Sequence, residues 1–179
     1  MLHPDDLKVH KHILSICYDI AKRSTCCSVN VGACVYDKSI NNIFSEGYNG
    51  VPEGAKTCNH IAIERDWLKN GAMNPEKRPM HSVWSVDNEV HAEMRAILSE
   101  NFMNYSNKNH YLVLYCTHSP CYNCCKHLAS LSSGVINEIV FSEKYDRMNS
   151  NFDYVEYFKQ FNIKVKHIPL EQSLRNNIK

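Results

Sequence analysis

The chain has 179 residues, a formal net charge of +1 and no apolar run near the roughly 20 residues that a membrane span needs. Proteins that grip polynucleotide backbones usually carry a clear basic surplus, so this charge disfavours DNA or RNA as a partner. Nine cysteines, an odd number, indicate reduced thiols and metal ligands rather than a disulfide framework. We therefore expect one cytoplasmic domain, residues 1–179, with no polynucleotide or membrane partner.

The N-terminal part of the chain predicts a helix followed by a hairpin. Asp5 or Asp6 can cap a helix, because apolar residues recur at helical spacing from Leu7 to Ala21. Two β-branched, apolar runs follow across a polar turn. We expect residues 29–36 and 43–48 to form antiparallel strands.

The middle of the chain, about residues 58–85, predicts an insertion. A short helix at 61–69 is expected to lead into a proline-containing loop that ends at Trp84. Asp87 or Asn88 can cap the next helix, which is expected to begin near Glu89 and to carry the motif described below.

The remainder of the chain alternates strands with helices. Strands are expected at 111–116, 137–141 and 163–168, and helices at 121–131 and 152–161. Such alternation predicts an α/β fold with a central sheet between helices. The tail after Pro169, residues 169–179, is expected to fray.

Two short motifs carry the chemistry. His91-Ala92-Glu93 is followed by Ser119-Pro120-Cys121-Tyr122-Asn123-Cys124, and H-x-E with P-C-x-x-C is the signature of zinc-dependent nucleobase deaminases. One imidazole and two thiolates, from His91, Cys121 and Cys124, fill three zinc positions and leave the fourth for water. Glu93 is then the general acid and base that moves protons between water and a cytosine-type ring.

Each half of this signature has a simpler explanation when taken alone. A lone Cys-x-x-Cys is more often a structural zinc half-site or a redox pair. A redox pair of the thioredoxin type follows the first strand, however, whereas this pair follows a late apolar run. A zinc ribbon needs a second Cys-x-x-Cys, but Cys26 and Cys27 are adjacent. The two halves together favour the catalytic site.

The residues around these motifs resemble the deoxycytidylate (dCMP) deaminases, most closely the phage-type members, over nearly the whole chain. The matching segments are 23–26, 31–33, 47–50, 81–85, 91–93 and 117–121. The Gly-Tyr-Asn-Gly element at 47–50 separates dCMP deaminases from tRNA adenosine deaminases and free-cytidine deaminases. The resemblance implies a three-layer α-β-α cytidine-deaminase-like fold, with a five-stranded mixed sheet flanked by helices.

The same resemblance implies an activity and its setting. The activity is the zinc-dependent hydrolysis of dCMP to dUMP and ammonia, which supplies dUMP for dTTP synthesis. The implied assembly is a homo-hexamer in the cytoplasm, of a host cell if the chain is viral. Effectors are implied as well: dCTP with magnesium activates, and dTTP inhibits, through a site that includes Gly47, Tyr48, Asn49 and Gly50.

Further residues acquire roles through the resemblance. Those expected to bind substrate are Asn49, Ser119, Pro120, Tyr145 and Arg23. Four other residues match positions that bind a second, structural zinc in some phage-type members, namely Cys26, Cys58, His81 and Glu89. Two thiolates, an imidazole and a carboxylate would close a tetrahedral site that pins the middle insertion to the sheet.

One position departs from the family pattern and leaves its role open. Family members often carry Asn two residues after the catalytic Glu, where this chain has Arg95. Arg95 either contributes to monophosphate recognition or replaces a structural contact. Two other functions also stay open: deamination of another free cytosine nucleotide, such as dCTP or a modified dCMP, and a catalytically silent zinc-binding interaction module. Retention of Glu93, which is not a ligand, argues against the silent module.

Overall fold

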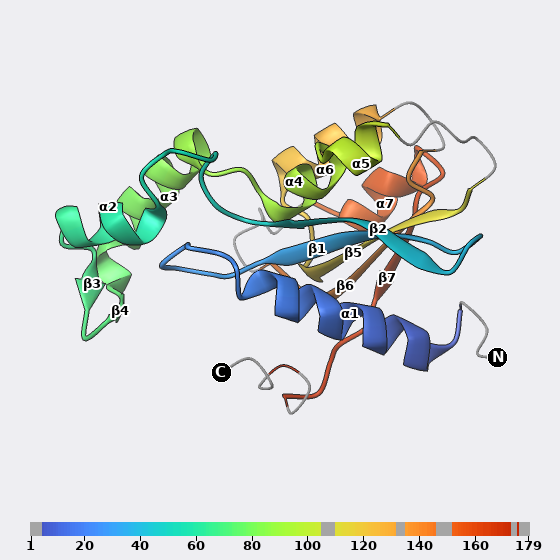
Figure 1. The fold of residues 1–179 in the computed structure, drawn as a ribbon, viewed down its shortest axis with the longest axis horizontal. Helices are drawn as coiled ribbons and strands as arrows, with labels where there is room; N and C mark the ends of the chain where they lie inside the picture. Colours follow the sequence, from blue (N-terminus) through green and yellow to red (C-terminus); the bar gives the residue numbers. More distant parts are fainter. Residues whose placement is uncertain (1–4, 105–109, 132–134, 146–151, 173–174, 176–179) are drawn as a thin grey trace.

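A five-stranded mixed sheet forms the centre of the molecule (Figure 1). The computed structural model describes residues 5–104, 110–131, 135–145, 152–172 and 175. The sheet has the strand order β2-β1-β5-β6-β7, in which β1 pairs antiparallel with β2 and β5, and β5, β6 and β7 run parallel. The strands are β1 (Gly32–Asp37), β2 (Asn42–Tyr48), β5 (Leu112–His118), β6 (Glu138–Glu143) and β7 (Lys164–His167).

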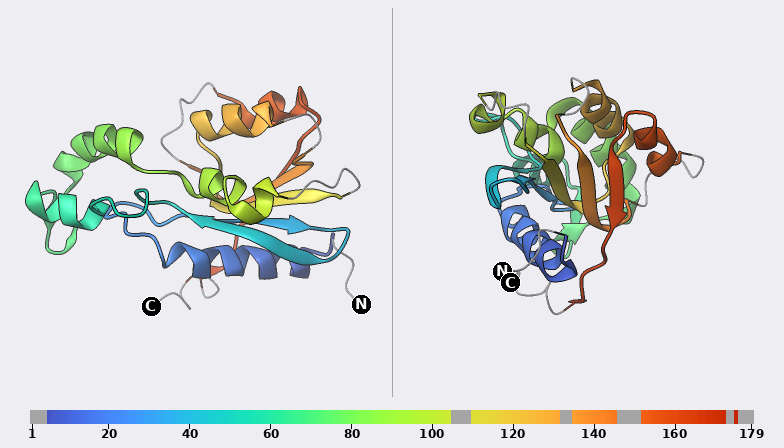
Figure 2. Two further views of the ribbon diagram at one scale, coloured as in Figure 1. Left: turned by 45° about the horizontal axis from the view of Figure 1, so that its top comes forward. Right: turned by 90° about the vertical axis from the view of Figure 1, so that its right-hand side faces the viewer.

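Helices cover both faces of this sheet (Figure 2). Helix α1 (Leu7–Ala21) lies on one face, and its apolar side packs on β1, β5 and β6. The other face carries α4 (Ala92–Ile97), α5 (Glu100–Met103), α6 (Tyr122–Ser130) and α7 (Tyr154–Lys159). The three-layer α-β-α arrangement expected from the resemblance is confirmed.

Local chemistry explains where α1 starts and how closely it packs. The Asp6 carboxylate accepts a hydrogen bond from the Lys8 N–H at 2.9 Å, so the predicted cap is confirmed at Asp6. The helix also lies directly against the start of β1. A Cβ atom on Gly32 would come within 2.0 Å of the Cys17 carbonyl oxygen, so only glycine permits this approach.

The segment between β2 and α4 stands away from the sheet and has a small core of its own (Figure 1). It contains α2 (Cys58–Glu64), β3 (Leu68–Lys69), β4 (Ala72–Met73), a 3₁₀ turn η1 (Pro75–Lys77) and α3 (Arg78–Asn88). Trp67 is completely buried in this core and makes edge-to-face contacts with His81 and Trp84. Aromatic packing therefore holds the segment together.

Several predictions for the middle of the chain were wrong. The helix expected at 61–69 ends at Glu64, and residues 68–69 pair with 72–73 in a hairpin instead. Much of the stretch expected to be a proline-containing loop up to Trp84 is helical. Its second proline lies in the first turn of α3, where the missing N–H is tolerated. Asp87 and Asn88 end α3 rather than cap the next helix, whose N-cap is His91.

The start of the first strand and the C-terminal tail also differ from expectation in detail. Residues 29–31 precede the first strand, which begins at Gly32. The tail does not fray at once after Pro169, since Leu170 is buried and its N–H donates to Ser142 Oγ at 3.2 Å. Residues 173–174 and 176–179 of the tail lie outside the described residues.

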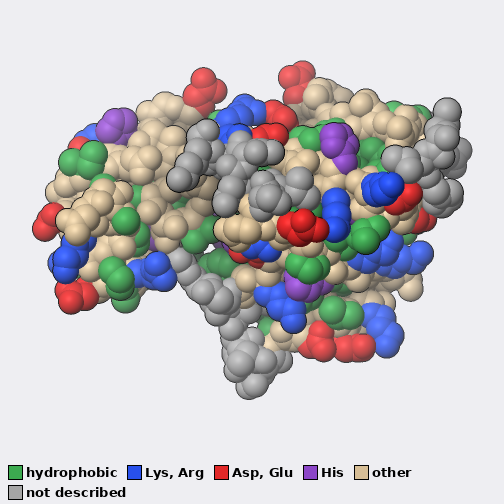
Figure 3. Space-filling view, turned by 90° about the horizontal axis from the view of Figure 1, so that it is seen from below, with side chains coloured by type: hydrophobic (Ala, Val, Ile, Leu, Met, Phe, Trp, Pro, Cys, Tyr) green, Lys and Arg blue, Asp and Glu red, His purple; other side chains and the backbone are tan. Residues whose placement is uncertain are grey.

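Two further observations concern the distribution of charge on the surface and the lengths of the helices. Lys and Arg side chains are interspersed with Asp and Glu on the face seen in Figure 3, and they form no continuous basic stripe there. Within the described part of the chain, no helix has both the length and the apolar character needed to cross a membrane.

Candidate active site and metal centres

The first cluster of metal-type ligands joins the starts of two helices. His91 is the N-cap of α4, and Cys121 is the N-cap of α6, one turn before Cys124. Both cysteine sulfurs lie 3.3 Å from His91 Nδ1. In a tetrahedral zinc site, S and N ligands lie about 3.6 Å apart. The three predicted ligands therefore fit one zinc ion and leave its fourth position open.

The close contacts within this cluster shift the pKa values of its members in opposite directions. Hydrogen bonding from Cys124, together with His91, lowers the pKa of Cys121 to about 4 against the opposing effect of burial. Hydrogen bonding to Cys121 in turn raises the pKa of His91 to about 9. These contacts favour Cys121 as a thiolate, which is the form that binds zinc. The raised pKa values of His91 and Cys124 mean that both would release a proton when a metal binds.

Glu93 lies in the first turn of α4 and is 4 % exposed. It lines the same cavity as His91 and Cys121 but is not a member of their ligand cluster. Burial raises the pKa of its carboxyl group, which brings it closer to neutrality. A buried carboxyl group beside an open metal position has the properties of a general acid and base.

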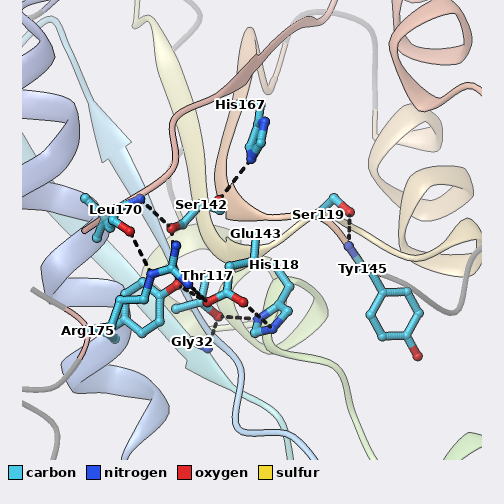
Figure 4. A network of polar contacts seen from close by, with 11 residues as sticks. Gly32, Thr117, His118, Ser119, Ser142, Glu143, Tyr145, His167, Leu170 and Arg175 are labelled. Carbon is cyan, nitrogen blue, oxygen red and sulfur yellow. Dashed lines mark hydrogen bonds and ion pairs between the residues drawn. The ribbon is translucent and has the colours of Figure 1, made fainter. Parts of the chain in front are cut away.

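Three of the predicted substrate residues, Asn49, Ser119 and Tyr145, line this cavity. The Asn49 side chain fixes the cavity wall: Oδ1 accepts from the Val31 N–H at 2.8 Å, and Nδ2 donates to the Val29 carbonyl at 2.9 Å. Ser119 Oγ accepts from the Tyr145 N–H at 2.8 Å, and Figure 4 shows the Tyr145 ring pointing away from the neighbouring polar network.

The other two predicted substrate residues do not line the cavity. Pro120 lies beside the cavity, and its carbonyl oxygen accepts a hydrogen bond of 3.6 Å from the Cys125 thiol. Arg23 lies outside, pairs with Glu46, and stacks over the Tyr48 ring at 4.7 Å from its centroid. A role for Arg23 in substrate binding stays a prediction that its position does not favour.

The element Gly47-Tyr48-Asn49-Gly50, at the end of β2, packs against α4 and the residues just before it. Gly47 packs directly on α4, and Gly50 exchanges backbone hydrogen bonds of 3.1 and 2.8 Å with Val90. The Tyr48 ring lies under two guanidinium groups, those of Arg23 and Arg95. This element therefore contacts the segment that carries His91, while its role in effector binding stays a prediction.

Arg95 makes a structural contact. Its Nη2 donates to the carbonyl oxygens of Gly50 and Val51 at 2.9 Å each, and it does not line the cavity. Of the two roles that the sequence left open, this geometry favours the structural one. The guanidinium holds the turn after β2 against α4.

Gly47→Ala is expected to lower the free energy of unfolding by about 1–3 kcal/mol, because overpacking forces the backbone apart. A Cβ at Gly47 would lie 2.3 Å from the Ala92 carbonyl oxygen and 2.4 Å from the Ala96 nitrogen. The matched control is Gly50→Ala, whose Cβ would meet only side-chain atoms at 3.8 Å or more. Thermal unfolding of the two variants tests this; equal melting temperatures would contradict the close packing.

A second cluster contains the four residues expected to bind another zinc. The ligand atoms of Cys26, Cys58, His81 and Glu89 all lie within 4.8 Å of one another. Cys26 Sγ lies 3.6 Å from His81 Nε2, and Ser85 Oγ donates to Glu89 Oε2 at 2.5 Å. The other carboxylate oxygen, Glu89 Oε1, is buried and has no hydrogen-bond partner among the described residues. A buried carboxylate oxygen is costly unless it meets a cation, so the donor set fits a metal.

The two clusters share one cavity. Cys26, His81 and Glu89 of the second cluster line it together with His91 and Cys121 of the first. Only Val90 separates Glu89 from His91 in the sequence. The second cluster therefore lies where the segment 58–88 meets the rest of the fold, and it forms part of the wall of the catalytic cavity.

A polar network beside the cavity was not predicted from the sequence (Figure 4). His118 lines the cavity, and its Nε2 lies 3.9 Å from Glu143 Oε2. Glu143 Oε1 accepts from Tyr18 at 2.6 Å and pairs with Arg175 of the tail at 3.2 Å. Lone charged residues on three distant segments give no periodic signal, so only the fold reveals that they meet.

The helix-flanked sheet, the three-ligand cluster and the buried glutamate beside this cluster are together the features of a zinc-binding deaminase. A family model for the cytidine and deoxycytidylate deaminase zinc-binding region matches residues 7–143. The chain belongs to this cytidine and deoxycytidylate deaminase family.

Curated relatives and solved structures agree with this assignment. The chain is 34% identical to the deoxycytidylate deaminase of Enterobacteria phage T4, over 88% of each chain. It is 26% identical to the human deoxycytidylate deaminase, over 79% of this chain and 68% of that protein. Among solved structures, the dCMP deaminase from cyanophage S-TIM5, in complex with dCMP and dUMP, has a TM-score of 0.60 at 23% identity, covering 89% of this chain and 96% of that one. That likeness concerns the fold alone.

Proposed function

We propose that this chain catalyses the zinc-dependent hydrolytic deamination of dCMP to dUMP and ammonia. The observation that carries the proposal is the buried Glu93 carboxyl group, which opens onto the same cavity as the three-ligand cluster. Relatives that match 88% of the chain are named deoxycytidylate deaminases, which supports dCMP as the substrate. A silent binding module would have no use for a buried carboxyl group that holds no metal.

The residues divide the chemistry between them. His91, Cys121 and Cys124 would hold a zinc ion, which would lower the pKa of a bound water molecule toward neutrality. Glu93 accepts a proton from the attacking water and delivers protons to ring N3 and to the leaving amine. Asn49 and Ser119 shape the wall against which the base lies. The products are a uracil ring and ammonia.

Turnover measurements on a panel of substrates test the proposal. We expect dCMP to be deaminated faster than dCTP, cytidine or deoxycytidine at equal concentration, as measured by ammonia release. A preference for dCTP or for a modified dCMP would assign the chain to another free cytosine nucleotide. Absence of turnover on all cytosine substrates by the zinc-loaded protein would contradict the proposal.

We also propose that dCTP with magnesium activates the enzyme, that dTTP inhibits it, and that the chain assembles as a homo-hexamer. The packing of Gly47 on α4 supports an effector site here, because a change at the 47–50 element is transmitted directly to the helix that carries Glu93. The same substrate panel, repeated with dCTP plus magnesium and with dTTP, tests the regulation. Sedimentation of the purified protein tests the assembly.

We further propose that Cys26, Cys58, His81 and Glu89 hold a second zinc, which attaches the segment 58–88 to the sheet. The purified protein is then expected to contain two zinc ions per chain, and Cys58→Ala only one, because the variant lacks one of the four ligands of the second site. Elemental analysis measures both values. One zinc per chain in the unmodified protein would contradict the second site.

A further inference from the structure

A third thiol lies against the second metal cluster. Cys27 Sγ lies 3.4 Å from Cys58 Sγ, and the Cys27 N–H also donates to this sulfur at 3.4 Å. Cys27 is not among the four clustered ligands. It is half-buried, whereas Cys58 is completely buried. A half-buried cysteine therefore lies in contact with a completely buried member of the second cluster.

No other close pair of sulfurs in the described structure combines these properties. Cys17 and Cys34 have sulfurs 3.5 Å apart, but both are completely buried and belong to neither metal cluster. At the first cluster, Cys121 and Cys124 are both ligands, and the neighbouring Cys125 thiol donates to the Pro120 carbonyl instead. The contact of Cys27 with Cys58 is thus a distinct feature of the second cluster.

We propose that Cys27 and Cys58 form an oxidisable pair that reacts with hydroperoxides, and that the resulting disulfide withdraws Cys58 from the second metal. The metal-release part of this proposal rests on the second zinc site proposed above. The pair itself rests only on the contact of the two sulfurs. A disulfide requires a sulfur separation of about 2.05 Å, so the two atoms must approach by roughly 1.4 Å.

The reaction balances with the peroxide as the only oxidant. The Cys27 sulfur attacks one peroxide oxygen; an S–O bond forms, the O–O bond breaks, and the peroxide leaves as an alcohol, or as water if it is hydrogen peroxide. The Cys58 sulfur then attacks the Cys27 sulfur; the S–S bond forms and the S–O bond breaks, with loss of water. Two thiols are oxidised to one disulfide, and one peroxide is reduced.

Loss of Cys58 would leave three ligands, Cys26, His81 and Glu89, around the second position. These three residues also line the catalytic cavity, so release of the metal would change the wall of the active site directly. The backbone contact between Thr25 and Asn59, a hydrogen bond of 3.1 Å, keeps the two cysteine-bearing segments together during the change. A thiol reductant and fresh zinc should therefore restore the starting state.

The test uses the purified, reduced and zinc-loaded full chain treated with hydrogen peroxide. Released zinc is followed with a coloured chelator, and disulfides are located by peptide mass mapping. We expect one of two zinc ions per chain to be released, together with a Cys27–Cys58 disulfide, and both changes to reverse with dithiothreitol and zinc. Cys27→Ser should keep both zinc ions at the same peroxide dose, whereas the control Cys34→Ala should respond as the unmodified protein does.

Three results would overturn the proposal. Equal zinc release from Cys27→Ser would show that a ligand thiol reacts directly. A first disulfide at Cys17–Cys34 or Cys121–Cys124 would show that the contact does not direct the chemistry. If the untreated protein holds one zinc, the second metal site fails on its own; the mapped disulfide then decides the pair alone, and its absence rejects it.

Discussion

Glu93→Gln should keep its full zinc content and lose the deamination of dCMP by about 10³-fold or more. The amide has nearly the shape of the carboxylate, so it fills the same buried position on α4. It cannot accept a proton from water or deliver one to the leaving amine, and general acid–base catalysis accounts for factors of roughly 10²–10⁴. Steady-state ammonia release and elemental zinc analysis on one preparation measure the two quantities.

The matched control for this variant is Glu100→Gln. Glu100 lies in the short helix after α4 and is exposed, so the same change of charge there should leave turnover within about twofold. A Glu93→Gln enzyme with normal turnover would mean that another group moves the protons. One that has lost zinc would mean that Glu93 supports the metal rather than the substrate.

Cys121→Ala should lose the catalytic metal and, with it, all measurable activity. Removing one of three protein ligands leaves only His91 and Cys124, and a lost ligand cannot be replaced by the methyl group. The second cluster does not include Cys121, so that metal should remain. With the proposed second zinc in place, the zinc content is expected to fall from two ions per chain to one. The ion that is lost is the one that Cys58→Ala keeps.

Cys125→Ala provides the control on the same helix. Cys125 is also buried on α6, next to the ligand Cys124, but its thiol donates to the Pro120 carbonyl and it belongs to neither metal cluster. It should keep the same zinc content as the unmodified protein while losing some stability through the small cavity left behind. Loss of zinc from Cys125→Ala as well would indicate a general collapse of α6 rather than a ligand effect.

The parts of the fold set by local patterns could be predicted from the sequence. The cap at Asp6 and the antiparallel pairing of β1 with β2 follow from side-chain chemistry within a few residues. The three ligands of the first cluster could be predicted as well, because their spacing at two helix starts is itself the signature.

The segment between β2 and α4 shows why the remainder could not be predicted. A proline at the first turn of a helix and a proline in a loop look alike in a single sequence, so α3 was missed. Trp67 and Trp84 stabilise this helix through contacts between segments, which no periodicity reveals. The groove beside the catalytic cavity, lined by Ser82 and Val86 of α3 and by Tyr122 of α6, was missed for the same reason.

Val90 is the single residue between Glu89 of the second cluster and His91 of the first, and its position restricts insertions and deletions at this point of the chain. Glu89 and His91 are both in extended conformations, and in an extended chain alternate side chains point the same way. Both therefore face the cavity, while the Val90 backbone is fixed by its two hydrogen bonds to Gly50. Substitutions at Val90 should be tolerated among homologues, whereas inserting or deleting one residue there would turn one ligand away and disable one metal site.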